Sequence, residues 1–320
     1  MNKKRLLFKQ NSGAIPLTYV WKSVFEPYFE FGTFSVTDSV DMYNPENDVI
    51  WVISPEDALG LVEPWLDAGY KVVLDYLWDH YGASYSIENA FLLKTNNIIL
   101  MHESLHYRTL GYKESYYNNN PDKLFLCLMH QDRPNRAALY DKVKKYSDTS
   151  LISFVSRGIV LQGDVSFEQT GGYTGFPSWQ NFANLNWYNS TAFSLVSETS
   201  VYDSRFYTEK TLKAFAHKHP LVVWGAANIL KRLKKLGFET FGHVIDESYD
   251  NIIDNNLRLD KISEVVDTMN KEFQKNRYFL HDAKTKEIIE HNHNLFYNEK
   301  FIAKLIDDEV IGPLKRFVYE

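Results

Sequence analysis

The chain has 320 residues, 44% of them hydrophobic and 24% charged, and a formal net charge of −6 at pH 7. This composition excludes a disordered chain and leaves room for two globular domains of ordinary size. A net negative charge argues against a protein that coats nucleic acid. The one cysteine, Cys127, lies in an apolar run, so the sequence predicts no disulfide framework and favours a reducing compartment.

The first ten residues start basic but turn polar after three apolar residues, which is not the pattern of a signal peptide. No apolar run approaches the roughly 18 residues that a membrane-spanning helix needs. The sequence therefore predicts a cytoplasmic protein, either of a bacterial cytosol or of the cytosol of a virus-infected cell.

The first half of the chain alternates short apolar runs with an amphipathic helix, a pattern typical of α/β domains. Strands are expected at residues 6–9, 49–54, 71–75 and 98–102. A helix is expected at residues 55–68, with Ser54 as N-cap, Pro55 in its first turn and Gly69 directly after its end.

A polar, turn-rich stretch at residues 112–123 separates the two halves. In the second half, strands are expected at 124–130, 150–155, 192–197 and 221–224, and helices at 136–146, 209–217 and 226–236. A loop at residues 161–190, rich in glycine and aromatic residues, is long enough to favour an acceptor-side or lid element. Residues 287–320 are helical by their apolar spacing.

The segment most informative about function runs from residue 191 to residue 225. A buried strand ends in the carboxylate of Glu198, and after a polar turn Thr208 N-caps a helix that begins with Glu209 and Lys210. In an open α/β sheet, ligands bind beyond the carboxyl ends of the strands, where helix N-termini point their N–H groups. A carboxylate beside an ammonium group at that place suits a ligand with sugar hydroxyls and phosphates, such as a nucleotide sugar.

This segment resembles the family-10 glycosyltransferases, the α1,3-fucosyltransferases. That family carries Glu-Asn-Ser, then Tyr-x-Thr-Glu-Lys, then a strand with Pro-x-x-x-x-Gly. The counterparts here are residues 198–200, 206–210 and 220–225. Thr199 replaces the family's Asn, and Phe206 stands where the family often has Tyr.

A second match, at residues 124–143, resembles the first strand, basic turn and helix of the family's donor domain. The resemblance implies that Lys210 holds the donor diphosphate together with Arg136, or with Arg133 as the second choice. It also implies that Glu209 holds the ribose, with Glu198 and Thr208 beside the donor.

The resemblance implies a GT-B-like fold: two Rossmann-like α/β domains facing across a cleft, with a C-terminal helix crossing back. The expected domains are residues 1–122 on the acceptor side, residues 123–285 for the nucleotide-sugar donor, and a helical tail at residues 286–320. The implied activity is transfer of fucose, or of another hexose or pentose, from a nucleoside-diphosphate sugar to an acceptor hydroxyl, with inversion.

An inverting transfer needs a carboxylate that deprotonates the acceptor hydroxyl. Asp75, Asp79 and Glu103 stand at or after expected strand ends in the first half, and the sequence does not rank them. The chain has no Asp-x-Asp motif, the usual metal clamp of other nucleotide-sugar transferases. Cationic side chains and a helix N-terminus would then stabilise the leaving diphosphate, so neither a metal nor another cofactor is expected.

Two other classes of protein remain as alternatives. Residues 102–106 spell the H-E-x-x-H motif of zinc metallopeptidases, in which His102 and His106 would bind the metal from one face of a helix. However, the preceding residues read as a strand, and no third ligand stands at the expected spacing. A non-catalytic carbohydrate- or nucleic-acid-binding protein would keep the fold but release no nucleoside diphosphate.

The acceptor is expected to be a glycan or, as the less favoured alternative, a hydroxymethylated base in DNA. Phosphate contacts or other peripheral contacts would use the basic face of the helix at 226–236, formed by Lys231, Arg232, Lys234 and Lys235. A solvated surface that balances acidic neighbours is the simpler interpretation of that face.

Overall fold

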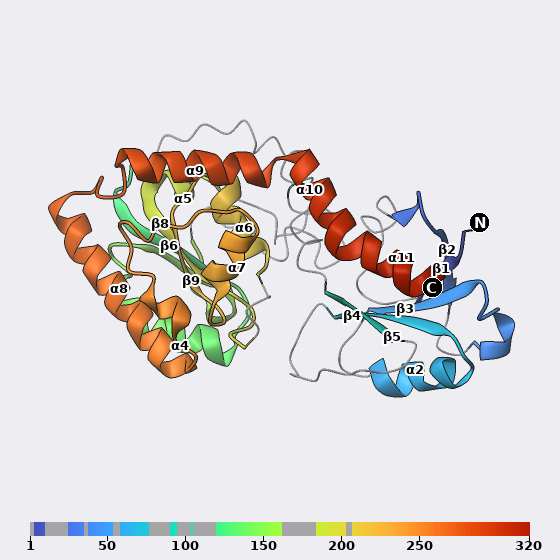
Figure 1. The fold of residues 1–320 in the computed structure, drawn as a ribbon. Helices are drawn as coiled ribbons and strands as arrows, with labels where there is room; N and C mark the ends of the chain where they lie inside the picture. The colour runs from blue at the N-terminus through green and yellow to red at the C-terminus, as the bar shows by residue number, and fades with distance from the viewer. Residues whose placement is uncertain are drawn as a thin grey trace. The chain divides into compact units, whose positions relative to one another are not determined.

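The computed structural model describes residues 3–9, 25–34, 38–53, 58–76, 90–94, 104, 120–161, 184–202 and 207–320. The chain forms two compact units (Figure 1): unit 1 contains Met1–Ile98 and Lys300–Glu320, and unit 2 contains Ile99–Glu299. These limits differ from the sequence boundaries after residues 122 and 285. The division into acceptor-side, donor-binding and tail segments therefore remains a proposal about function.

Unit 1 is built on a parallel sheet whose described strands have the order β2-β1-β3-β4-β5. The strands are β1 (Arg5–Lys9), β2 (Glu30–Phe34), β3 (Asp48–Ile53), β4 (Lys71–Tyr76) and β5 (Ala90–Lys94). The side chains of Leu7, Ile50 and Val72, which are paired across three neighbouring strands, are buried. The expected strands at 6–9, 49–54 and 71–75 are confirmed. Strands β2 and β5 are present in the structure but were not expected from the sequence. The expected strand at 98–102 lies outside the described residues.

The helices of unit 1 come from both ends of the chain. They are η1 (Val40–Met42), α2 (Ala58–Asp67), α10 (Glu299–Ile306), the π-helical segment Asp307–Ile311 and α11 (Gly312–Tyr319). Helix α2 is followed by Gly69, whose φ of +82° is the left-handed conformation expected of a glycine after a helix. Helices α2 and α11 lie on opposite faces of the sheet (Figure 1), so the C-terminal helix crosses back onto unit 1 as predicted.

Unit 2 is built on a second parallel sheet, with its described strands in the order β7-β6-β8-β9. They are β6 (Lys123–Met129), β7 (Leu151–Phe154), β8 (Thr191–Ser197) and β9 (Leu221–Trp224). All seven residues of β8 are buried, as expected of an interior strand of a parallel sheet, although three of them, Thr191, Ser194 and Ser197, carry hydroxyl groups. The chain moves to one side of β6 to form β7 and then returns to the other side for β8, so the strand order reverses between β6 and β8.

Two helical layers cover this sheet. The helices are α4 (Pro134–Val143), α5 (Leu185–Ser190), α6 (Glu209–Ala216), α7 (Ile229–Lys235), α8 (Asn255–Lys275) and α9 (Ala283–Phe296), with short 3-10 turns at Lys144–Tyr146, Val155–Arg157 and Ser248–Asn251. Helices α4 and α8 pack on one face and α6 and α9 on the other (Figure 1). Lys142 of α4 pairs with Asp260 of α8 at 2.7 Å, and Lys218 after α6 pairs with Glu290 of α9 at 2.8 Å.

The predicted fold class, α/β with two Rossmann-like units, is therefore confirmed. The prediction of a loop at residues 161–190 is wrong for the last six residues, because Leu185–Ser190 forms α5, with Trp187 and Tyr188 buried. The rest of that loop, residues 162–183, lies outside the described residues. Within the described part of the chain, no helix is long and apolar enough to span a bilayer.

Candidate functional site

The candidate site lies at the carboxyl end of the unit 2 sheet, where the strand order reverses between β6 and β8. Three segments meet there: the turn after β6, which leads into α4, the residues after β8, and the N-terminus of α6. Ligands of open α/β sheets bind at such a switch point. The sequence analysis placed its donor-binding residues on these same segments.

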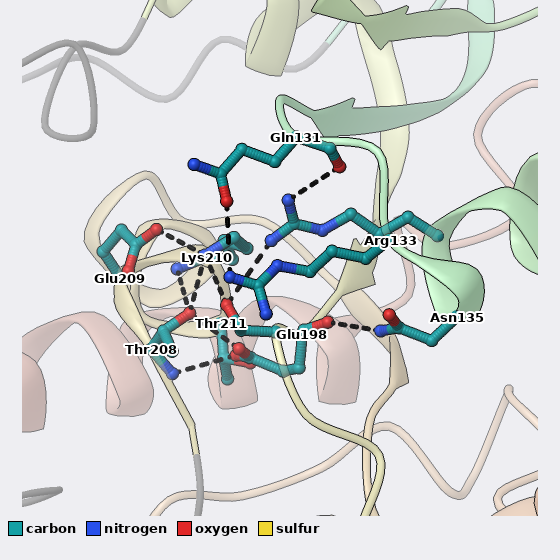
Figure 2. A network of polar contacts seen from close by, with 10 residues as sticks. Gln131, Arg133, Asn135, Glu198, Thr208, Glu209, Lys210 and Thr211 are labelled. Atoms are coloured by element: carbon teal, nitrogen blue, oxygen red, sulfur yellow. Dashed lines mark hydrogen bonds and ion pairs between the residues drawn. The ribbon is translucent and has the colours of Figure 1, made fainter. Parts of the chain in front are cut away.

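Glu198 follows β8 and is fully buried. Its Oε1 accepts the backbone N–H of Thr208 at 3.0 Å and the hydroxyl of Thr211 at 2.5 Å, and its Oε2 accepts the hydroxyl of Thr208 at 2.6 Å. Figure 2 shows both threonines turned toward this carboxylate at the start of α6. Glu198 thus holds the N-terminus of α6 in place with both of its carboxylate oxygens.

The first turn of α6 presents a pair of opposite charges. Thr208 is the N-cap, and its hydroxyl accepts the backbone N–H of Lys210 at 3.3 Å. The ammonium of Lys210 contacts Glu209 Oε1 at 2.5 Å, with the two side chains 19% and 16% exposed. Burial acts to raise the pKa of Glu209, but Lys210 and, more weakly, Lys213 outweigh burial and hold the pKa below its ordinary value.

Arg136 lies in the first turn of α4 and is only 4% exposed. Its Nη1 donates to the carbonyl of Gln131 at 3.1 Å and its Nη2 to the hydroxyl of Thr199 at 3.4 Å, while Nε has no hydrogen-bond partner among the described residues. No carboxylate of the described residues forms an ion pair with it. Burial and then the neighbouring Arg133 lower the pKa of Arg136, against the opposite influence of two glutamates.

Arg133, the second candidate for phosphate binding, is the residue directly before α4. Its Nη2 donates to Gln131 Oε1 at 3.3 Å (Figure 2). His130 comes just after β6, and its pKa is lowered by burial, then by Arg136 and Lys210. The imidazole is therefore neutral at pH 7, and its surroundings are electropositive.

The backbone around the site is fixed by two further contacts that the sequence analysis does not identify. Asn135 Nδ2 donates to the carbonyl of Glu198 at 3.0 Å, and Trp224 Nε1 donates to the carbonyl of Asn135 at 2.9 Å. These bonds tie the first turn of α4 to the ends of β8 and β9. Position after the end of β6 is the sequence signal that could have singled out Gln131, whereas Asn135 stands in the first turn of α4.

Arg258 of α8 also stabilises the backbone next to the site. The side chain is 1% exposed, and all five of its N–H groups donate to oxygen atoms. The acceptors are the carbonyls of Gly225, Ile252, Ile253 and Val201, at 2.6 to 3.0 Å, and the side chain of Asn255. Because no donor remains, Arg258 fixes the backbone after β8 and β9 and cannot bind an anion.

The general-base candidates are not part of this described cluster. Asp75 lies in β4 of unit 1, and Asp79 and Glu103 lie outside the described residues. The same is true of both histidines of the H-E-x-x-H motif. Among the residues that the structure does describe, no group of His, Cys, Asp and Glu side chains is arranged to hold a metal ion.

The basic face of α7 is partly engaged within the protein. Lys234 pairs with Glu247 at 2.9 Å, while Lys231 and Lys235 are exposed and Arg232 is half-buried. The N-terminus of α7 is capped by Asp250, which accepts the backbone N–H groups of Leu230 and Lys231 at 3.0 and 3.1 Å.

Neither a protein-family profile nor a curated protein matches the chain. A crystal structure of alpha1,3-fucosyltransferase with GDP-fucose is similar, with 10% sequence identity, a TM-score of 0.48, and coverage of 99% of this chain and 91% of that chain. A structure of alpha1,3-fucosyltransferase with GDP has 13% identity, a TM-score of 0.43, and coverage of 94% and 92%. Both carry the name of the family that the sequence motifs resemble. Similarity of this degree does not extend to substrate or activity.

Proposed function

We propose that the protein is a glycosyltransferase that uses a nucleoside-diphosphate sugar. The observation that carries this proposal is Arg136, a guanidinium 96% buried at the sheet's switch point whose described partners are a carbonyl and a hydroxyl. Buried charges in proteins are normally paired, so an anion is the expected partner of this side chain. Lys210 shares the Thr199 hydroxyl with Arg136, which sets two cations next to each other. A diphosphate carries the two negative charges that match them.

In the proposed complex, Arg136 and Lys210 bind the diphosphate, with Arg133 as a further cation at the edge. Glu209 accepts hydrogen bonds from the ribose hydroxyls, and the positive end of the α6 helix dipole favours the diphosphate. Glu198 and Thr208 position these groups, because their own polar atoms are bonded to each other and to α6.

The proposed reaction is an inverting displacement at the anomeric carbon of the sugar. The acceptor oxygen forms the new bond to that carbon as the bond to the diphosphate oxygen breaks, and the acceptor's proton passes to a carboxylate. Asp75, Asp79 and Glu103 are the candidates for this base. Negative charge develops on the leaving diphosphate, where Arg136 and Lys210 stabilise it without a metal ion.

The transferred sugar is proposed to be fucose or another hexose or pentose, and the acceptor a glycan or, as second choice, a hydroxymethylated base in DNA. We place this chemistry in the cytoplasm. If the acceptor is DNA, the exposed cations of α7 would contact its phosphates, and binding would weaken steeply with salt.

The test is a thermal-shift panel of nucleoside diphosphates and their sugars, followed by assays of nucleoside-diphosphate release with oligosaccharides and with hydroxymethylcytosine DNA. We expect at least one donor to raise the melting temperature and to turn over in the presence of a chelator. If no nucleotide of the panel binds, the proposal fails. Loss of turnover in chelator with rescue by manganese or zinc would overturn the metal-independent mechanism.

A further inference from the structure

The turn between β6 and α4 contains an acidic residue among its basic ones. Asp132 stands directly between Gln131 and Arg133. The carbonyl of Gln131 accepts a hydrogen bond from Arg136, and Arg133 is the further cation of the proposed complex. An unpaired carboxylate at this place would repel a bound diphosphate and compete with it for the neighbouring cations. The charge of Asp132 therefore has to be neutralised if the turn is to bind an anion.

Arg157, in the 3-10 turn after β7, pairs with this carboxylate through one hydrogen bond on each oxygen. Its Nε donates to Asp132 Oδ2 and its Nη2 to Asp132 Oδ1, both at 2.9 Å. The same guanidinium lies over the ring of Phe154, 4.6 Å from the ring centroid. Such a two-point contact is the strong, directional geometry between a guanidinium and a carboxylate. Both oxygens of Asp132 are thus bonded to a cation from outside the turn.

The backbone around Arg157 keeps the guanidinium in this place. Arg157 ends its 3-10 turn, and the next residue, Gly158, has a φ of +74°, a left-handed conformation that favours glycine. The chain then reverses and forms an antiparallel bridge with the end of β7. The N–H of Ser156 donates to the carbonyl of His130 at 3.0 Å. This bond joins the turn that carries Arg157 to the turn that follows β6.

We infer that Arg157 is a positioning residue that neutralises Asp132, so that the turn after β6 binds the donor diphosphate without opposition from its own carboxylate. This inference rests on the proposed function of the site. The two side chains are 34% and 48% exposed, and ion pairs of this kind contribute little to stability. Their effect is on the charge of the turn. Loss of Arg157 alone leaves an unpaired negative charge there, whereas loss of both charged groups leaves the net charge unchanged.

The experiment measures the affinity of the full chain for inorganic pyrophosphate by calorimetry, for the wild type, Arg157→Met, Asp132→Asn and the double variant. Arg157→Met removes the cation, so we expect binding to weaken by roughly 5- to 10-fold at low salt. The loss should shrink in about 0.5 M salt, which screens charges near the surface. Asp132→Asn should bind at least as tightly as the wild type, and the double variant should return close to wild-type affinity.

The matched control is Lys275→Met on α8, which removes an exposed cation from a 2.7 Å ion pair with Glu272 and should leave the affinity unchanged. Arg157→Lys keeps the charge and should recover part of the affinity that Arg157→Met loses. Recovery in the double variant would also exclude a folding defect, because that variant lacks the same two hydrogen bonds.

A purely structural role of Arg157 predicts a different pattern. If the two hydrogen bonds were needed to hold the turn, Asp132→Asn and the double variant would both bind as weakly as Arg157→Met. That result would overturn the inference, as would wild-type affinity of Arg157→Met. Absence of pyrophosphate binding by the wild type would refute the proposed anion site, and this inference with it.

Discussion

The ammonium group of Lys210 contacts three oxygens of its own chain: the Glu209 carboxylate and the hydroxyls of Thr199 and Thr208. The ion pair with Glu209 is partly buried and holds the ammonium at the helix N-terminus. In the proposed reaction the same ammonium meets the charge that develops on the leaving diphosphate. Its contribution should therefore be larger in the transition state than in the ground state.

We expect Lys210→Ala to lower kcat/KM for the identified donor by about two to three orders of magnitude, mainly through kcat. Steady-state kinetics with the best donor of the panel would measure this. Lys271→Ala, an exposed position on α8, is the matched control and should keep wild-type rates. Equal kcat/KM for Lys210→Ala and the wild type would show that the diphosphate binds elsewhere.

Glu198 offers a test that separates positioning from ligand binding. Glu198→Gln replaces one acceptor oxygen by an NH2 group, which leaves at least one of its three hydrogen-bond donors from Thr208 and Thr211 without an acceptor. We expect the free energy of unfolding, measured in urea, to fall by about 2 kcal/mol and pyrophosphate affinity to fall with it. Weaker binding at unchanged stability would instead mean that Glu198 itself contacts the donor.

Single-residue features of the site could be predicted where they depend on local sequence. The N-cap role of Thr208 and the strand end at Glu198 follow from patterns within a few residues. The contact of Arg136 with Thr199 joins residues 63 positions apart and depends on β8, not β7, being the inner neighbour of β6. No local pattern specifies that strand order, so the sequence could supply the side chains of the site but not their partners.

At the scale of elements, α11 is attached to unit 1 by polar contacts at its C-terminal end. The ammonium of Lys71 in β4 donates to the carbonyls of Phe317 and Val318 at 2.6 and 3.4 Å. The hydroxyl of Tyr319 accepts the backbone N–H of Lys4 at 3.2 Å and donates to the carbonyl of Tyr28 at 3.1 Å. A cation at a helix C-terminus satisfies carbonyl groups that have no partner within the helix.

We expect Lys71→Met to destabilise the docking of α11 by about 1–2 kcal/mol, because two terminal carbonyls lose a charged donor. Hydrogen exchange of the α11 amides should then become faster while that of α8 in unit 2 stays unchanged. Lys300→Met, at an exposed position of α10, serves as the control. Unchanged protection of α11 in Lys71→Met would show that apolar packing alone holds the helix.

The strands that the sequence did not predict, β2 and β5, are the two edges of the described unit 1 sheet. Interior parallel strands are buried on both faces and read as continuous apolar runs, as in β3, whereas an edge strand needs fewer apolar residues. This explains why β2 was not predicted, but not β5, whose sequence Ala-Phe-Leu-Leu-Lys is apolar. Strand β2, Glu-Phe-Gly-Thr-Phe, also contains a glycine, which argues against a strand on propensity alone. In unit 2, where the described strands are strongly apolar, the expected boundaries agree with the observed ones to within one or two residues.

For the molecule as a whole, two buried histidines make stability depend on pH. Burial lowers the pKa of His217 to about 3, with Lys213, His219 and His293 acting in the same direction. Burial also lowers the pKa of His219 to about 4, although its bond to Thr191 acts against this. The ring of His219 is held neutral: Nε2 donates to the Thr191 carbonyl at 2.8 Å, and Nδ1 lies 2.7 Å from the Ser194 hydroxyl.

Both histidines bind protons more readily in the unfolded chain, where their pKa is about 6.5. Their contribution to stability is therefore complete above about pH 6.5 and is lost as the pH falls toward 4. At pH 5 the expected loss is about 2 kcal/mol for each histidine. Urea unfolding between pH 7.5 and 4.5 would measure the slope, which should be reduced in His219→Gln. A pH-independent midpoint down to pH 5 would contradict these pKa values.

The return of α11 to unit 1 has a consequence for synthesis on the ribosome. Unit 1 is discontinuous: its second segment, Lys300–Glu320, is translated only after all of Ile99–Glu299. At about 5–20 residues per second, these roughly 200 residues take about 10–40 s. During that interval the nascent N-terminal segment lacks Leu314 and Val318, two buried side chains of α11, so the apolar surface that they cover faces water. Unit 2 is continuous and can close its core first, which makes the earliest translated segment the last to complete its fold and a natural client for a chaperone.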